Sequence, residues 1–143
     1  MARWQRTNGS NIPDHAVRGG YEPDGKALFV ARAYHNGEWI PGKAAYHLPG
    51  CHIPWGGKEM IMPDYEVLVF HTRENGLLDW QKCHGGQCPP NAFCCQPGLY
   101  PARAYYQGGL HPGKLHPSHG CTYISYGGKE IAIKDYEVLY QAK

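Results

Sequence analysis

The chain has 143 residues, enough for one ordinary domain or two small ones, and a formal net charge of only +2. Its 14 Lys and Arg are scattered among 12 Asp and Glu, so we expect neither a nucleic-acid partner nor membrane insertion. No apolar run approaches the ~20 residues of a membrane helix, and the N-terminal "MARWQRTNGSN" lacks the apolar core of a signal peptide; we therefore expect a cytoplasmic location or release by a non-classical route.

The first predicted elements are short strands. The 19 Gly and 12 Pro interrupt the chain too often for a helix of three turns, so the predicted fold class is all-β. The segment "ALFVARAYH", residues 27–35, is predicted to be a strand that ends at an Asn36-Gly37 turn. The segment Pro41-Gly42-Lys43 is then predicted to form a rigid corner, because Pro restricts φ and Gly permits unusual values.

A hairpin and a core strand follow. The segment "CHIPWGGKEMIM", residues 51–62, is predicted to be a β-hairpin whose Gly-Gly pair suits a type I′ turn. The Lys58–Glu59 pair inside it is interpreted as exposed hairpin charge. The segment "DYEVLVF", residues 64–70, is apolar-rich and predicts a core strand, and "HTRENGLLDW", residues 71–80, is interpreted as a connection.

The same elements then recur. Residues 31–68 match residues 102–139 without a gap at an offset of 71, and 18 of the 38 aligned pairs are identical. Upstream, residues 4–17 match residues 80–93 at an offset of 76. A unit of about 70 residues is too long for a solenoid turn. The repeat therefore predicts two β-rich domains, residues 1–72 and 77–143, related by a pseudo-two-fold axis.

Six cysteines leave several interpretations open. Cys83, Cys88, Cys94 and Cys95 cluster in "CHGGQCPPNAFCC", but their spacing is not that of a paired CxxC zinc site. Without a signal peptide, free or partly oxidised structural thiols are favoured, ahead of a local disulfide and of zinc. No metal and no cofactor is expected.

The two copies differ in one loop. Between the matched segments the first copy has 13 residues and the second has 8, and the longer loop carries Tyr21, Glu22 and Asp24. A carboxylate, an ammonium group such as that of Lys43, and an aromatic face together suit a polyol, which they bind through hydroxyls and the apolar C–H face. The same residues also fit an exposed acidic turn with a local salt bridge.

The doubled pattern "PDHAVRGGYEPDG…LFVARAYHNG…PGK…GGKE…DYEVL" resembles the DM-nine repeat proteins, which include natterin-related mannose-specific lectins of bivalve molluscs. The resemblance extends from Trp4 to Leu139. It implies a protomer of two β-rich domains, often paired into a homodimer, that binds mannose without metal and serves innate recognition of microbes. In this family mannose recognition depends on a loop acid and on the lysine of Pro-Gly-Lys, which are here Glu22 and Lys43.

One departure from the family is that Glu22 stands where these proteins typically carry Asp, and Asp24 is the alternative for the key carboxylate. Lys114 repeats the lysine in the second copy, which lacks the loop carboxylate, so Lys114 is a second-site candidate only. No Gly-x-Ser-x-Gly, HExxH or phosphate-loop motif is present, and we do not expect an enzyme. The alternative function is a zinc- or thiol-stabilised interaction module without sugar binding. The full set of predicted sugar-binding residues is Tyr21, Glu22, Asp24, Trp39 and Lys43.

Overall fold

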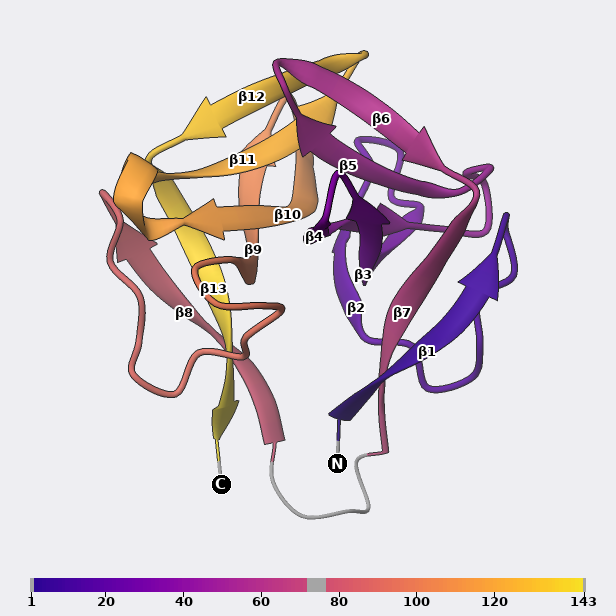
Figure 1. Ribbon diagram of the computed structural model, residues 1–143, viewed down its shortest axis with the longest axis horizontal. Helices are drawn as coiled ribbons and strands as arrows, with labels where there is room; N and C mark the ends of the chain where they lie inside the picture. Colours follow the sequence, from indigo (N-terminus) through magenta and orange to yellow (C-terminus); the bar gives the residue numbers. More distant parts are fainter. Residues whose placement is uncertain (1, 72–76, 143) are drawn as a thin grey trace.

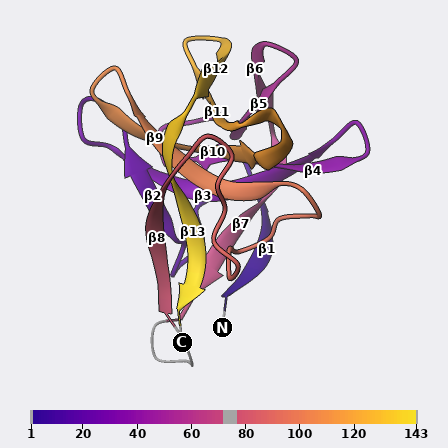
Figure 2. The same ribbon diagram turned by 90° about the vertical axis from the view of Figure 1, so that its left-hand side faces the viewer.

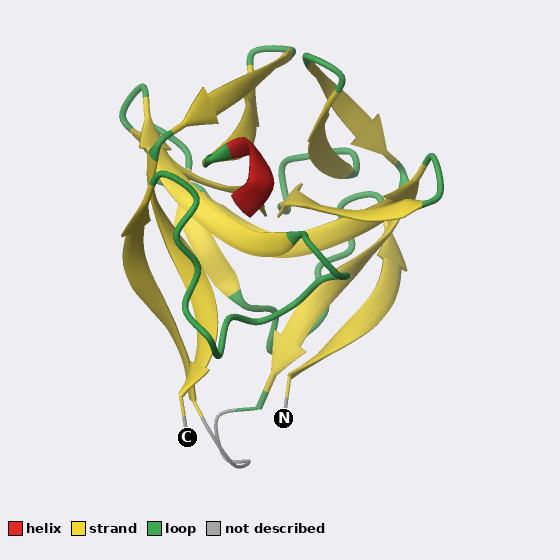
Figure 3. Cartoon of the chain, turned by 60° about the vertical axis from the view of Figure 1, so that its left-hand side comes forward, coloured by secondary structure: helices red, strands yellow, loops and turns green. Residues whose placement is uncertain are grey.

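The computed structural model describes residues 2–71 and 77–142, and it confirms the all-β prediction. In this part of the chain one three-residue 3-10 turn, η1 (Pro117–His119), is the sole helical segment, and it connects β10 to β11 within the second repeat (Figure 3). No helix among the described residues is long and apolar enough to cross a membrane.

Seven strands come from the first repeat: β1 (Ala2–Asn8), β2 (Arg18–Tyr21), β3 (Ala27–His35), β4 (Glu38–Ala44), β5 (Cys51–Trp55), β6 (Lys58–Met62) and β7 (Asp64–Phe70). The second repeat supplies β8 (Leu77–His84), β9 (Tyr100–Tyr106), β10 (Gly109–His116), β11 (Cys121–Tyr126), β12 (Lys129–Ile133) and β13 (Asp135–Ala142).

The strand order reflects the duplication. Neighbouring strands follow the order β1-β7-β3-β4-β5-β6-β12-β11-β10-β9-β13-β8, which is symmetric about the contact between β6 and β12. The two halves lie side by side in Figure 1, with the described ends of the chain at the bottom. Strand β2 stands outside this order, because it pairs with β3 of its own repeat and with β10 of the other. Hydrogen bonding therefore joins the repeats into one continuous structure.

The two Gly-Gly hairpins stand next to each other at the top of the molecule (Figure 2). Gly56 and Gly57 have φ values of 62° and 82°, and Gly127 and Gly128 have φ values of 61° and 84°, as a type I′ turn requires. The Glu59 amide donates to the Gly128 carbonyl at 3.0 Å, and the Glu130 amide donates to the Gly57 carbonyl at 3.1 Å. Each hairpin tip is thus paired to the other repeat by the same backbone contact.

The prediction that Pro-Gly-Lys forms a corner is wrong. Both copies lie inside strands, in β4 and β10. The glycine is needed for close strand packing, since a Cβ on Gly42 would lie 2.3 Å from the carbonyl oxygen of His52. A Cβ on Gly113 would likewise lie 2.1 Å from the carbonyl oxygen of Tyr123. The glycine of Pro-Gly-Lys therefore makes room for a neighbouring strand and does not form the predicted turn.

The predicted connection over residues 71–80 is also wrong for the part that the structure describes. Leu77–His84 forms β8, which pairs along its whole length with β13, while residues 72–76 of that prediction lie outside the described residues. Each repeat has its own main apolar cluster, the first of which also includes Leu99 of the second repeat, and a third cluster joins them. Val30 and Leu68 of the first repeat pack there with Leu139 of the second, so the core continues from one repeat into the other.

Candidate functional site

Strand β4 carries Lys43 into the interior, where its side chain is only 3% exposed. Its Nζ donates to the carbonyl oxygen of Ser125 at 2.7 Å and to Nδ1 of His111 at 3.1 Å. Both partners belong to the second repeat, so this lysine connects the two halves. An ammonium group has three N–H donors, and the hydrogen bonds among the described residues account for two of them.

Lys43 lines a small cavity between the repeats. The cavity measures about 210 Å³ and combines residues of the first repeat with the tip of the β11–β12 hairpin. Its polar lining consists of two carboxylates, one ammonium group, one imidazole and one phenol. Its lining residues are Glu22, Lys43, Leu48, His52, Glu59, Tyr126 and Gly127.

Glu59 is fixed at this cavity by two hydrogen bonds. Its Oε2 lies 2.8 Å from Nδ1 of His52, and its Oε1 accepts from the Gly128 amide at 2.9 Å. Burial favours the neutral acid, but these hydrogen bonds and the Lys43 charge outweigh it and hold the pKa of Glu59 at about 2. The carboxylate is therefore ionised at neutral pH.

Glu22 faces the same ammonium group from the loop after β2. The amide of Glu22 donates to the Lys26 carbonyl at 2.8 Å, which closes the loop, and Oε2 lies 2.9 Å from Nε2 of His47. Burial lowers the pKa of Lys43, and the charges of Glu59 and Glu22 oppose that shift. Neither carboxylate makes a direct ion pair with Lys43 in the described structure. An open space therefore separates the Lys43 ammonium group from the carboxylates of Glu22 and Glu59.

The structure separates the other predicted residues from this cavity. Asp24 is exposed and accepts from the Lys26 amide at 3.1 Å, a hydrogen bond that lowers the pKa of Asp24. Tyr21 is the last residue of β2, where it pairs with Leu110 of β10. Trp39 lines a different cavity, described below. Of the five predicted residues, Glu22 and Lys43 are brought together.

Sequence reasoning missed His52, Glu59 and Tyr126. Glu59 was interpreted as exposed hairpin charge, and this is wrong: its side chain is 12% exposed and points into the site, whereas Lys58 is exposed as expected. The available signal was the retention of Gly-Gly-Lys-Glu in both copies. Tyr126 supplies the aromatic ring that had been assigned to Tyr21, with its centroid 5.7 Å from the Lys43 Nζ.

The equivalent lysine of the second repeat has a direct acidic partner. Lys114 is also buried, but its Nζ lies 3.1 Å from Oε2 of Glu130 in a direct ion pair. The residue matching His52 is Tyr123, so no imidazole holds the acid away from the lysine. The loop equivalent to Glu22 contributes Gln96, whose Oε1 accepts from the Trp39 amide at 2.6 Å. Lys114 is therefore paired directly with an acid, whereas Lys43 has no such pair among the described residues.

All six cysteines are free thiols. Burial raises the pKa of Cys51, and it raises that of Cys95 to about 12, which keeps both protonated at neutral pH. In the described ranges no group of three or more His, Cys, Asp or Glu side chains is arranged to hold a metal ion.

Known proteins resemble both the sequence and the fold. Natterin-4 of Thalassophryne nattereri is 35% identical over 138 residues, which cover 95% of this chain and 33% of that protein. Natterin-1 of the same organism is 30% identical over 141 residues, which cover 95% of this chain and 37% of that protein. The chain thus spans about a third of the length of these relatives.

Among solved structures, the nematode sperm cell motility protein MFP2B superposes with a TM-score of 0.76 over 99% of this chain and 44% of its own. At 16% sequence identity this likeness shows the fold alone. The DM9 repeat model matches residues 1–60, 22–133 and 95–143, which together cover the whole sequence. The chain belongs to the DM9 repeat family.

Proposed function

We propose that the cavity beside Lys43 binds a saccharide of the mannose type, which makes the protein a lectin. The observation that carries this proposal is the gap between the Lys43 ammonium and the carboxylates of Glu22 and Glu59. A sugar hydroxyl placed there accepts from Lys43 and donates to a carboxylate, which satisfies both partners with charge-assisted hydrogen bonds. Two neighbouring hydroxyls of one sugar ring can donate one hydrogen bond each to Glu22 and Glu59.

The dimensions and the lining suit one sugar ring. The cavity of about 210 Å³ is smaller than the ~300–1,000 Å³ typical of sites for drug-sized ligands. Tyr126 offers an aromatic surface for the C–H face of a pyranose. The preference for mannose rests on the likeness to mannose-specific members of the family, as do our proposals of a homodimer and of a role in recognising microbial mannans.

Titration calorimetry with methyl α-D-mannopyranoside tests the proposal. We expect saturable binding that is weaker for methyl α-D-glucopyranoside, because that sugar differs in the orientation of one hydroxyl. Chemical shifts of the Gly127 amide, at the rim of the cavity, should change during the titration. The absence of mannoside binding, or binding that leaves Gly127 unchanged, would exclude this cavity as the mannose site.

A further inference from the structure

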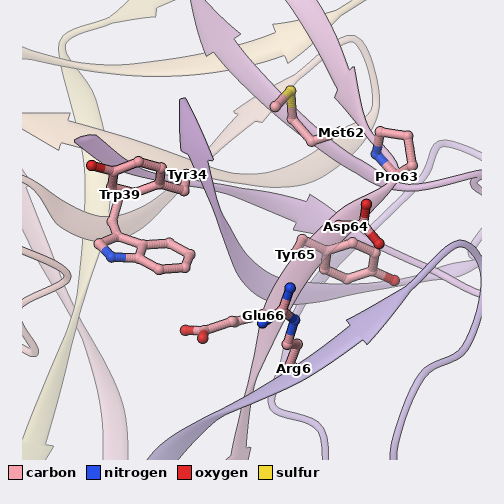
Figure 4. Close-up of a pocket in the computed structure, with 8 residues that line it drawn as sticks. All are labelled: Arg6, Tyr34, Trp39, Met62, Pro63, Asp64, Tyr65 and Glu66. Atoms are coloured by element: carbon pink, nitrogen blue, oxygen red, sulfur yellow. The ribbon is translucent and has the colours of Figure 1, made fainter. Parts of the chain in front are cut away.

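A second cavity lies on the first repeat, away from Lys43. It measures about 500 Å³ and is lined by Arg6, Tyr34, Trp39, Asp64, Tyr65 and Glu66, among others. Figure 4 shows the rings of Tyr34 and Trp39 on one side of this cavity and the side chains of Asp64, Tyr65 and Arg6 on the other. It has no lining residue in common with the cavity beside Lys43. We call it the aromatic groove.

The second repeat carries a counterpart of this groove, about 270 Å³ in volume. Its lining residues include Lys82, Arg103, Tyr105, Asp135, Tyr136 and Glu137. The offset of 71 matches four lining residues of the two grooves as identical pairs, and the offset of 76 matches Arg6 with Lys82, which keeps the positive charge. The duplication has thus preserved the same chemistry at both places.

Part of this identity serves the fold. The Tyr65 hydroxyl donates to the Gly9 carbonyl at 2.6 Å, and Glu66 forms an ion pair with Arg32 at 2.7 Å. The equivalent Tyr136 and Glu137 make contacts of the same kind in the second repeat. These buried or half-buried pairs are therefore explained by stability.

Two further identical pairs are not explained in this way. Of the 18 identical pairs in the aligned segment, only three non-glycine pairs are exposed in both copies: Tyr34 with Tyr105, Lys58 with Lys129, and Asp64 with Asp135. The first and the third line the two grooves. Tyr34 is 57% exposed and Tyr105 is 63% exposed, and an aromatic ring so exposed gains little from packing. Contact with a ligand would explain why an exposed tyrosine is present at this position in both repeats.

The charges of the aromatic groove favour a neutral, polar ligand. Glu66 is neutralised by Arg32, and the charges of Arg6 and Asp64 offset each other. Tyr34 and Trp39 meet edge to face, with ring centroids 5.3 Å apart at 65°, and Arg32 lies over one face of the Trp39 ring. A polyhydroxyl ring fits this combination, because its C–H face packs on an aromatic ring while its hydroxyls donate to Asp64 and accept from Arg6.

We propose that the aromatic groove is a second saccharide site, which binds a pyranose ring independently of Lys43. The groove of the second repeat has fewer groups free to contact a sugar. Leu110 replaces Trp39 there, and Nδ1 of His84 lies 2.6 Å from Oδ1 of Asp135, which occupies that carboxylate. Together with the cavity beside Lys43 the aromatic groove gives one chain two separated saccharide sites, and a surface that occupies both is bound with higher avidity; this gain rests on the proposed function.

The indole N–H signal of Trp39 in nitrogen-15 NMR spectra reports on this groove. The signal is assigned with Trp39→Phe and followed in the Lys43→Met protein, to separate the two sites. Methyl α-D-mannopyranoside, methyl β-D-glucopyranoside and methyl β-N-acetylglucosaminide are the probes. We expect a saturable shift with at least one probe, and its loss in Tyr34→Ala and in Asp64→Asn but not in Tyr105→Ala.

The outcomes separate the two sites. If Trp39 stays unchanged with all three probes while Gly127 of the wild-type protein responds to mannoside, the groove proposal fails and the lectin proposal stands. If Trp39 responds and Gly127 does not, the groove is the sugar site and the cavity beside Lys43 is not. A Trp39 response that survives both Tyr34→Ala and Asp64→Asn would also overturn the groove proposal.

Discussion

The Nζ of Lys43 lies 2.7 Å from the carbonyl oxygen of Ser125, a residue 82 positions further along the chain. Because this hydrogen bond crosses from one repeat to the other, the site exists only when the two repeats are packed together. Tyr126 and Gly127 border the same cavity from the second repeat. The two repeats together thus form a candidate site that neither copy supplies alone.

The two repeated lysines should differ in sugar binding. We expect Lys43→Met to weaken methyl α-D-mannopyranoside binding more than tenfold, because a charge-assisted hydrogen bond contributes roughly 1.5–3 kcal/mol. Lys114→Met should change the affinity less than threefold, since Lys114 is already paired with Glu130. Titration calorimetry measures both, with thermal melts as the control for folding. Equal losses in the two variants would mean that both repeats bind sugar.

The two loop acids should also differ. Glu22 faces Lys43 across the cavity, whereas Asp24 is exposed and bonded to Lys26. We therefore expect Glu22→Gln to reduce mannoside affinity several-fold and Asp24→Asn to leave it unchanged. Affinities of the two variants, measured side by side, check this. A larger effect of Asp24→Asn would contradict the arrangement of the loop.

Sequence reasoning identified much of the fold for a definite physical reason. The strand over residues 27–35, both Gly-Gly hairpins and both "DYEVL" strands depend on local patterns, and the structure confirms them. Pro-Gly-Lys was misread because its glycine is required by a neighbouring strand and not by its own backbone turn. A contact of that kind leaves no local signal.

The lining of the cavity beside Lys43 was predicted only in part, because contacts from the other repeat leave no local signal in the sequence. Glu22 and Lys43 were identified through the family resemblance, but Tyr126 enters the site from the other repeat. The position of Tyr126 depends on the hydrogen bonds between the two hairpins, which no short sequence pattern predicts. The burial of Glu59 likewise follows from its bond to the Gly128 amide, 69 residues away.

Sugar binding should not require a metal ion. The donors and acceptors of the proposed site are protein side chains, and the described residues hold no cluster of three metal-ligating groups. We expect dialysis against EDTA to leave the mannoside affinity within twofold of its starting value. Calorimetry before and after dialysis is sufficient. Recovery of a lost affinity on adding back calcium or zinc would contradict the prediction.

Acid should destabilise the protein through His111. Burial and the Lys43 charge lower the pKa of His111 from 6.5 to about 4. Between these two values the unfolded chain binds a proton that the folded chain does not, so the free energy of unfolding falls as the pH falls, by about 3 kcal/mol in total for this group. Urea unfolding from pH 7 to pH 4 measures the slope. His111→Gln keeps an acceptor for Lys43 and should flatten that slope; identical slopes would show that His111 is not responsible.

Glu59 and Glu130 occupy equivalent positions in the two repeats and should differ in their contribution to stability. Glu130 accepts from the Gly57 amide at 2.8 Å and pairs with Lys114, which is 7% exposed. Removing its carboxylate leaves a buried ammonium without its partner, so we expect Glu130→Ala to cost about 3 kcal/mol of unfolding free energy. Glu59→Ala should cost less, about 1–2 kcal/mol, because Lys43 keeps its bonds to Ser125 and His111.

Binding should show the opposite order, since Glu59 and not Glu130 borders the cavity of Lys43. Urea unfolding and mannoside titration of both variants therefore give two independent rankings. The double variant Lys114→Ala/Glu130→Ala is the control for the stability ranking: it should be less destabilised than the sum of its single changes, because no unpaired charge remains. Additive losses in that double variant would indicate that the Lys114–Glu130 pair contributes nothing to stability as a pair.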